Sequence, residues 1–203
     1  MIRGIMERIA TVDSQKLDGT VEHDELYVKS GMKGRSYHYD IIRQRPPRKR
    51  GLKPPPGRGT FEQDQPMILC CYQRGGPTLF NVPQDSQPLA SYVCDTVSYG
   101  SSVYTDDYPA YDRLRDYGFG HHTVCHSLGE YARGDIHTNN CECRTNLFKQ
   151  WLAKFMGVNK YNLHLYARTF QFLHNIRHLD DCAKFIKILS IIVIATRFYI
   201  MSE

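Results

Sequence analysis

The chain has 203 residues and a mass of 23.5 kDa, the size of one domain with at most a small appendage. Hydrophobic residues make up 41% and aromatic residues 12%, which argues against a wholly disordered, collagen-like or coiled-coil chain. The net charge of +5 alone says little about a nucleic-acid partner. Seven irregularly spaced cysteines and no secretory signal at the start indicate free thiols in a cytoplasmic protein.

The first expected strand, residues 19–28, carries three acidic side chains in its middle, which a strand interior does not normally tolerate. A segment of very different composition follows. Residues 29–58 contain ten basic residues against one acid, together with five prolines that prevent regular structure. We therefore expect a long basic loop, inserted over residues 29–65, which is either functional or disordered.

Regular structure resumes at Pro66. Residues 66–72 and 78–82 predict two strands around the turn signal Arg74-Gly75-Gly76-Pro77. Helices and strands then alternate, and we expect them over residues 86–97 (helix), 101–106 (strand), 109–117 (helix), 122–126 (strand), 138–155 (helix) and 163–177 (helix). Three strands able to pair as a meander, followed by this alternation, predict an α/β fold with a mixed five-stranded sheet flanked by helices.

A last apolar run covers residues 188–196. It is shorter than the roughly 20 residues that a transmembrane helix needs. We therefore expect a buried helix or strand there, and no membrane partner.

Acidic residues stand in three of the expected elements. Asp24 lies in the first strand, Asp106 ends the fourth, and Glu142 lies in the first turns of a helix. If strands one and four are neighbours at the sheet centre, the three carboxylates converge, and their mutual repulsion is relieved when divalent cations bind between them. Oxygen ligands suit Mg²⁺ or Mn²⁺, and two such ions stabilise the attacking and leaving oxygens of a phosphoryl transfer.

The same helix carries two further polar candidates. Lys149 follows Glu142 by two helical turns and could hold a phosphate, and Asn139 precedes Glu142 by one turn. Simpler interpretations compete at each position: a polar face of an edge strand for Asp24, a turn after a strand for Asp106, and a solvated helix face for Glu142 and Lys149. Spacing alone leaves these alternatives open.

Four segments resemble the DDE transposases of insertion sequences, and most closely their ISXO-two-like domain of the IS-fifteen-ninety-five group. Two of them are Val21–Tyr27 (VEHDELY) and Val103–Tyr111 (VYTDDYPAY). The third is His137–Glu142 (HTNNCE) with Lys149 downstream, and the fourth begins at Gly157–Lys160 (GVNK). Together they span roughly residues 20–178.

The resemblance implies a ribonuclease-H-like core and cutting and joining of DNA that depends on Mg²⁺ or Mn²⁺, with two ions expected. Asp24 and Asp106 match the family's first two metal ligands. The third ligand is either Asn139 or Glu142. We prefer Glu142 because a carboxylate binds Mg²⁺ better than an amide does, which leaves Asn139 to orient water or substrate.

The implied partner is DNA, at the transposon ends and the target, gripped mainly through its phosphates. The expected contacts are Lys149 and the basic loop (Lys29, Lys33, Arg35, Arg43, Arg45, Arg48, Lys49, Arg50, Lys53 and Arg58). Lys154, Lys160, Arg168 and Arg177 could extend this surface. Because two DNA ends must be joined, we expect a homo-oligomer in the active complex, associated with the nucleoid when it is bound to DNA.

The expected domain organisation has three parts. Residues 1–18 form a short N-terminal lead, because the zinc-ribbon or helix-turn-helix region that usually precedes the family's first catalytic strand is missing. Residues 19–178 form the catalytic domain, and residues 179–203 form an apolar tail. Two alternatives stay open: a truncated DNA-binding remnant without catalysis, and a ribonuclease-H-fold nuclease that cuts without joining.

Overall fold

The computed structural model describes residues 2–12, 15–33, 59–83 and 88–200, without the side chains of His126 and residues 194–200. Most of the basic loop expected over residues 29–65 therefore lies outside the described residues.

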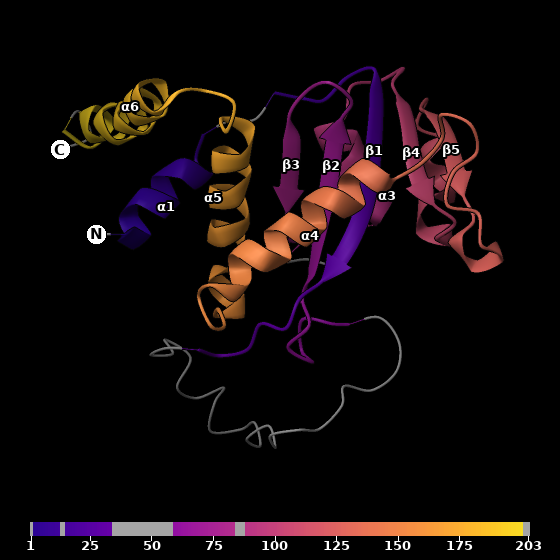
Figure 1. Ribbon diagram of the computed structural model, residues 1–203, viewed down its shortest axis with the longest axis horizontal. Coiled ribbons are helices and arrows are strands. Elements are labelled where there is room, and N and C mark those ends of the chain that lie inside the picture. The colour runs from indigo at the N-terminus through magenta and orange to yellow at the C-terminus, as the bar shows by residue number, and fades with distance from the viewer. Residues whose placement is uncertain (1, 13–14, 34–58, 84–87, 201–203) are drawn as a thin grey trace.

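The described chain folds around a five-stranded mixed sheet with strand order β3-β2-β1-β4-β5 (Figure 1). The first three strands in sequence pair antiparallel, whereas β1 with β4 and β4 with β5 pair parallel. This arrangement confirms the predicted α/β class and the predicted neighbourhood of the first and fourth strands. The strands are β1 (Thr20–Tyr27), β2 (Met67–Gln73), β3 (Thr78–Asn81), β4 (Ser102–Asp106) and β5 (Gly120–Val124).

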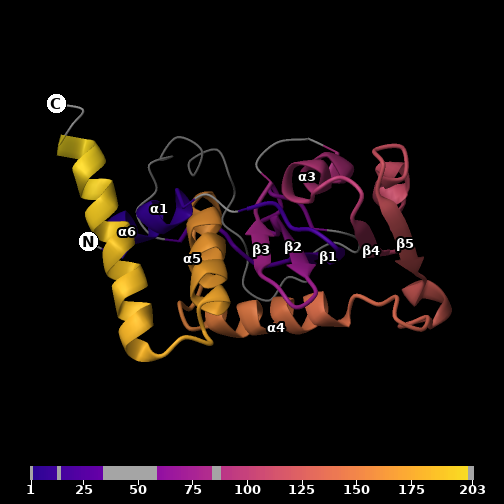
Figure 2. The same cartoon turned by 90° about the horizontal axis from the view of Figure 1, so that it is seen from above.

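Helices cover both faces of the sheet, with α3 on one side and α4 on the other in Figure 2. Beneath α3 (Leu89–Thr96) and the 3₁₀ helix η1 (Pro109–Leu114) lies one apolar cluster, which includes Val21 and Val103. The opposite cluster lies beneath α4 (Asn139–Ala153) and α5 (Leu163–Asn175). It holds Phe80, Phe148 and Phe170, with ring centroids 5.3–5.4 Å apart. Because side chains alternate along a strand, β1 contributes to both clusters.

Two helices lie outside these layers. The N-terminal α1 (Ile2–Ala10) packs against α5 through Met6 and Ile9, so part of the expected lead is a docked helix. The C-terminal α6 (Asp181–Ile200) contacts α1, and Arg8 donates a hydrogen bond of 2.7 Å to the carbonyl of Ile192. A short 3₁₀ helix, η3 (Lys160–Asn162), leads into α5, and another, η2 (His126–Leu128), follows β5.

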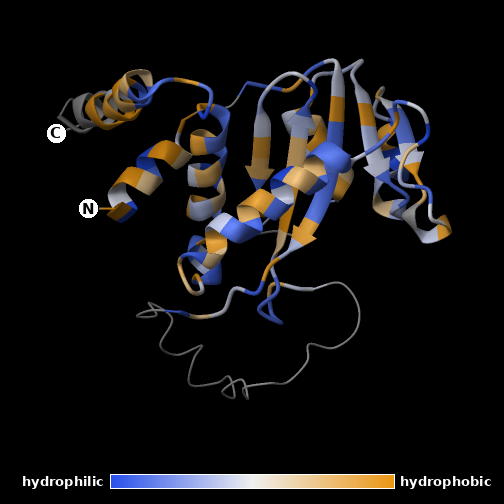
Figure 3. Cartoon of the chain, viewed as in Figure 1, coloured by the Kyte–Doolittle hydropathy of each residue, from blue (hydrophilic) through white to orange (hydrophobic). Residues whose placement is uncertain are grey.

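The expectation of a buried segment at residues 188–196 was half right. The segment is helical, but none of the α6 side chains that the structure describes is buried. The apolar stripe visible on α6 in Figure 3 is largely exposed, with Phe185 64%, Ile186 58% and Val193 51% accessible. The reason is that α6 is covered from one side only, mainly by α1. Among the described residues, no helix is long and apolar enough to span a membrane.

Other element bounds differ from prediction for local reasons. The fifth strand begins at Gly120 and not at residue 122, because Gly120 and His121 pair with Ser102 and Val103. Glycine fits there because a Cβ would lie 3.3 Å from the hydroxyl of Ser102. The helix expected over residues 109–117 is the shorter 3₁₀ helix η1, and the helix expected over 86–97 is described from Leu89.

Candidate active site

Two aspartates align on neighbouring parallel strands. Val21 pairs with Val103 and Glu22 with Tyr104, so the same register continued by two residues brings Asp24 beside Asp106. Side chains alternate along strands, so both carboxylates point to the face that α4 covers, the face of Glu22. Both are half-buried, and Asp106 Oδ1 accepts a hydrogen bond of 3.2 Å from the amide of Tyr108. The predicted juxtaposition of the first two acids is thereby supported by the backbone pairing.

Helix α4 presents Glu142 and Lys149 along one flank. Its buried residues Cys141, Thr145, Phe148 and Leu152 face the sheet. Trp151 marks the flank that packs on α5, with ring centroids 5.6 Å from Phe170.

At 100° per residue, Glu142 and Lys149 lie on the opposite flank, away from α5. Glu142 is half-buried, whereas Lys149 and Asn139 are exposed. Leu147 in α4 and Phe155 just after it lie off the core face, with 42% and 39% of their surface exposed.

The candidate ligands have the chemistry that Mg²⁺ requires, but they do not form a closed cluster. Three half-buried carboxylates from β1, β4 and α4 offer hard oxygen ligands on one side of the sheet. Within the described ranges, no three His, Cys, Asp or Glu side chains are gathered closely enough to hold one metal ion. The donor types therefore fit a divalent cation, and ligation by all three acids requires them to draw together.

Glu22 is the residue that sequence reasoning missed. Its side chain is fully buried, and its two oxygens receive four hydrogen bonds. Oε2 accepts from the backbone amides of Asn140 (2.9 Å) and Cys141 (3.2 Å), in the first turn of α4. Oε1 accepts from Asn140 Nδ2 (2.7 Å) and Arg74 Nε (2.8 Å). The positive end of the α4 dipole is thus occupied by the protein's own carboxylate.

Arg74, in the hairpin turn between β2 and β3, neutralises Glu22. Its Nη1 lies 2.7 Å from Asp135 Oδ2, and its Nη2 lies 3.1 Å from His137 Nε2. The guanidinium also covers the ring of Tyr104 at 4.9 Å. Partial burial tends to lower the pKa of Arg74, but the hydrogen bond and charge of Glu22, with Asp135, outweigh it and raise the pKa. The surplus of acids inside the first strand was the sequence signal for this ion pair.

The surroundings of the two aspartates are electrostatically coupled to them. Burial, contact with Cys70 and the negative charge of Asp24 raise the pKa of the Cys141 thiol well above its ordinary value. The thiol donates to the carbonyl of Glu22 at 3.1 Å. Burial and the nearby Tyr108 and Asp106 likewise raise the pKa of Tyr27. Cys141 therefore stays a neutral thiol that packs beneath the candidate site.

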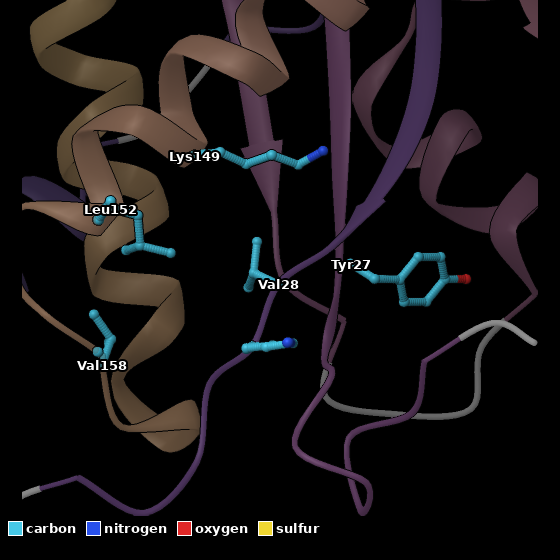
Figure 4. A pocket seen from close by; sticks show the side chains of 8 residues that line it. Tyr27, Val28, Lys149, Leu152 and Val158 are labelled. Carbon is cyan, nitrogen blue, oxygen red and sulfur yellow. The ribbon is translucent and has the colours of Figure 1, made fainter. Parts of the chain in front are cut away.

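A shallow pocket of about 320 Å³ continues from the end of β1 (Figure 4). Lys149 reaches across from α4, whereas the ring of Tyr27 points to the other side of the strand. The remaining walls of the pocket are mainly apolar. The residues that line it are Tyr27, Val28, Lys29, Lys149, Leu152, Ala153, Gly157 and Val158. Two of the predicted phosphate contacts, Lys29 and Lys149, thus border the same depression.

The other basic candidates of the expected loop differ in their surroundings. Those between Arg35 and Arg58 lie outside the described residues. Lys33 binds the turn that follows α4 by donating to the carbonyls of Phe155 (2.6 Å) and Met156 (3.0 Å).

The idea that Lys160 belongs to a DNA surface is wrong, because this side chain is buried. Lys160 Nζ donates to the carbonyl of Phe61 at 2.6 Å and lies 3.4 Å from Asp64 Oδ1. It fastens the last part of the 29–65 segment to the turn between α4 and α5.

Comparison with known proteins gives three findings. The family model described as the ISXO2-like transposase domain matches residues 16–175. An uncharacterized protein in transposable element ISH50 of Halobacterium salinarum is 38% identical over 159 residues, which cover 76% of this chain. The match covers 52% of that protein, so the chain spans about half of the relative's length. No solved structure matches.

Proposed function

The chain belongs to the ISXO2-like transposase family, and on that premise we propose that it catalyses metal-dependent cleavage of DNA and transfer of the cut strand during transposition. We also propose that its core is ribonuclease-H-like. The supporting observation is the strand order β3-β2-β1-β4-β5, with an antiparallel meander joined to two parallel strands. Membership of the family implies a DNA substrate, and transposition is the process that such domains serve.

The alignment of Asp24 with Asp106 is the observation that carries the catalytic proposal. Two carboxylates on adjacent central strands, on one face of the sheet, repel each other unless a cation lies between them. Glu142 projects from the α4 flank on the same side and supplies a third oxygen donor. We assign Asp24, Asp106 and Glu142 as the metal ligands, with Asn139 at the exposed start of α4 available to orient water or substrate.

Bound Mg²⁺ or Mn²⁺ supplies charge stabilisation at the attacking and leaving oxygens of a phosphoryl transfer. The chain's own residues orient the DNA around that centre. Lys149 stands two turns beyond Glu142 and, with Lys29, presents positive charge beside the pocket at the end of β1. We propose that these lysines and the basic loop hold backbone phosphates, so that DNA binding weakens steeply as salt rises. Joining two DNA ends would further require several copies in one complex.

The test is a nicking assay on supercoiled DNA with Mg²⁺ or Mn²⁺, combined with a joining assay that uses a labelled oligonucleotide with a free 3′-hydroxyl. Asp24→Asn, Asp106→Asn and Glu142→Gln should each abolish both activities and leave metal-free DNA binding intact. Asp107→Asn is the matched control, because Asp107 adjoins Asp106 but is exposed and bonded to Cys125 and Ser127.

Equal activity in all variants would refute the carboxylate assignment. Nicking without joining would reduce the proposed function to that of a nuclease.

A further inference from the structure

We propose that Glu22 is a positioning residue that, paired with Arg74, sets the place of Glu142 relative to Asp24. The inference rests on the proposed function, because it assigns a role in the assembly of the same site. Glu22 itself would bind neither metal nor DNA.

The hydrogen bonds of Glu22 already use its whole acceptor capacity. A carboxylate offers about four lone-pair directions, and four donors occupy them: two α4 amides, the Asn140 side chain and Arg74 Nε. Its side chain is fully buried, so water cannot substitute for a lost partner. Glu22 is therefore an acid of the same strand as Asp24 that is unavailable as a ligand.

The position of Glu22 in the chain connects the two halves of the site. Glu22 precedes Asp24 by two residues on the same face of β1, a rise of roughly 6.6 Å. The amides that it binds belong to Asn140 and Cys141, which directly precede Glu142. A single side chain thus joins the strand that carries Asp24 to the helical turn that carries Glu142. Loosening it would let that turn move and would raise the cost of drawing the three acids around a metal.

Arg74 explains why a buried acid can stand beside the metal-binding acids. Without a cation beside it, the negative charge of Glu22 would repel Asp24 and Asp106. Burying that unpaired charge would also cost several kcal/mol of folding free energy. The 2.8 Å ion pair with Arg74 removes that charge, and Arg74 is itself fixed by Asp135 and by the carbonyl of His137. The pair therefore provides a rigid anchor without becoming a competing cation site.

The experiment compares Glu22→Gln with Glu25→Gln in the full chain. Glu25 is the matched control, because it lies in the same strand and accepts a 2.7 Å hydrogen bond from Tyr111 on the opposite face. Hydrogen exchange measures protection of the Asn140 and Cys141 amides, calorimetry measures Mn²⁺ affinity, and the nicking assay gives the half-saturating Mn²⁺ concentration. Residues that orient metal ligands typically contribute about tenfold or more to metal affinity.

We expect Glu22→Gln to lose amide protection and to raise the half-saturating Mn²⁺ concentration by about tenfold. Excess Mn²⁺ should restore its nicking rate, which a merely structural defect would not permit. Glu25→Gln should keep the wild-type Mn²⁺ response even if it unfolds at a lower temperature. Asn140→Ala removes only one of the four donors and should show the same shift, smaller in size, if Glu22→Gln fails to fold.

The outcomes separate this inference from the proposed function. If Asp24→Asn weakens Mn²⁺ binding but Glu22→Gln and Asn140→Ala bind Mn²⁺ like the wild type, the positioning role is refuted and the proposed function stands. If Asp24→Asn leaves Mn²⁺ binding unchanged, the proposed function fails and the positioning role fails with it.

Discussion

Replacing His23 by leucine should remove a strong dependence of stability on pH. His23 lies in β1 on the α3 side of the sheet, fully buried, and neither of its ring nitrogens has a hydrogen-bond partner among the described residues. Its ring contacts the edge of Tyr111, with centroids 5.1 Å apart. Burial lowers the pKa of His23 from 6.5 to about 4, because the protonated ring cannot be solvated there.

The size and sign of the effect follow from that difference. The folded state binds this proton more weakly than the unfolded state. Protonation of His23 therefore has no effect on stability well above pH 6.5 and destabilises the fold as pH falls from 6.5 towards 4. At 1.36 kcal/mol per pKa unit, the complete loss is about 3 kcal/mol, of which about 2 kcal/mol is reached at pH 5. The difference in free energy of unfolding between His23→Leu and the wild type should therefore grow by about 2 kcal/mol, in favour of the variant, as the pH is lowered from 8 to 5.

The measurement is urea unfolding of both proteins at pH 8, 6.5 and 5, followed by circular dichroism. Other histidines contribute equally to both proteins and cancel in the difference. Among them is the half-buried His174, whose pKa is also lowered to about 4 by partial burial and nearby arginines. The variant should also be more stable at pH 8, since it removes two unsatisfied buried nitrogens. Parallel stability curves for the two proteins across this range would refute the reasoning.

Three further changes test the packing. Phe148→Ala should lower the free energy of unfolding, measured in urea, by about 3–5 kcal/mol, because the ring is fully buried against Phe80 and Phe170. A loss below about 1 kcal/mol would contradict the central position of Phe148 in the core. Lys160→Met should lower the free energy of unfolding by about 3–5 kcal/mol because it leaves Asp64 buried without its cation. Adding Asp64→Asn, which removes the charge and tolerates the φ of 60° at this position, should recover part of that loss in the same measurement. Gly19→Ala should lower stability by about 1 kcal/mol through its φ of +69° alone, since a Cβ there meets no atom within 4 Å; an unchanged melting temperature would argue against this conformation.

Local signals predicted most of the sheet. The Gly75-Gly76 turn between two apolar runs predicted the β2–β3 hairpin, and the order of strands and helices predicted that β1 and β4 could be neighbours. These local patterns did not predict which residues pair with the buried charge of Glu22. Glu22 and Asn140 are 118 residues apart, and neither position marks the other in the sequence.

Burial of a cation was equally hidden from local pattern. Lys160 looks like any solvated lysine in the sequence, and only the fold brings Asp64 and the ring of Phe61 around it, with Nζ 4.4 Å from the ring centroid. For helix α6 the sequence predicted burial, whereas the described side chains are exposed or half-buried. Its apolar run predicted burial, but burial depends on a neighbour to cover it, and α1 covers one side only.

The central place of β1 has a consequence for the chain as it leaves the ribosome. One edge of β1 pairs with β2 early, but the other waits for β4, whose residues are made about 80 positions later. At typical synthesis rates this leaves the edge open for roughly 4–16 s. An open strand edge invites pairing with another chain, and inward-pointing charges are one way in which proteins discourage it. During that interval the charges of Glu22 and Asp24 would disfavour pairing of the open edge of β1 with another chain. They would do so before β4 and α4, which complete the candidate site, have been synthesised.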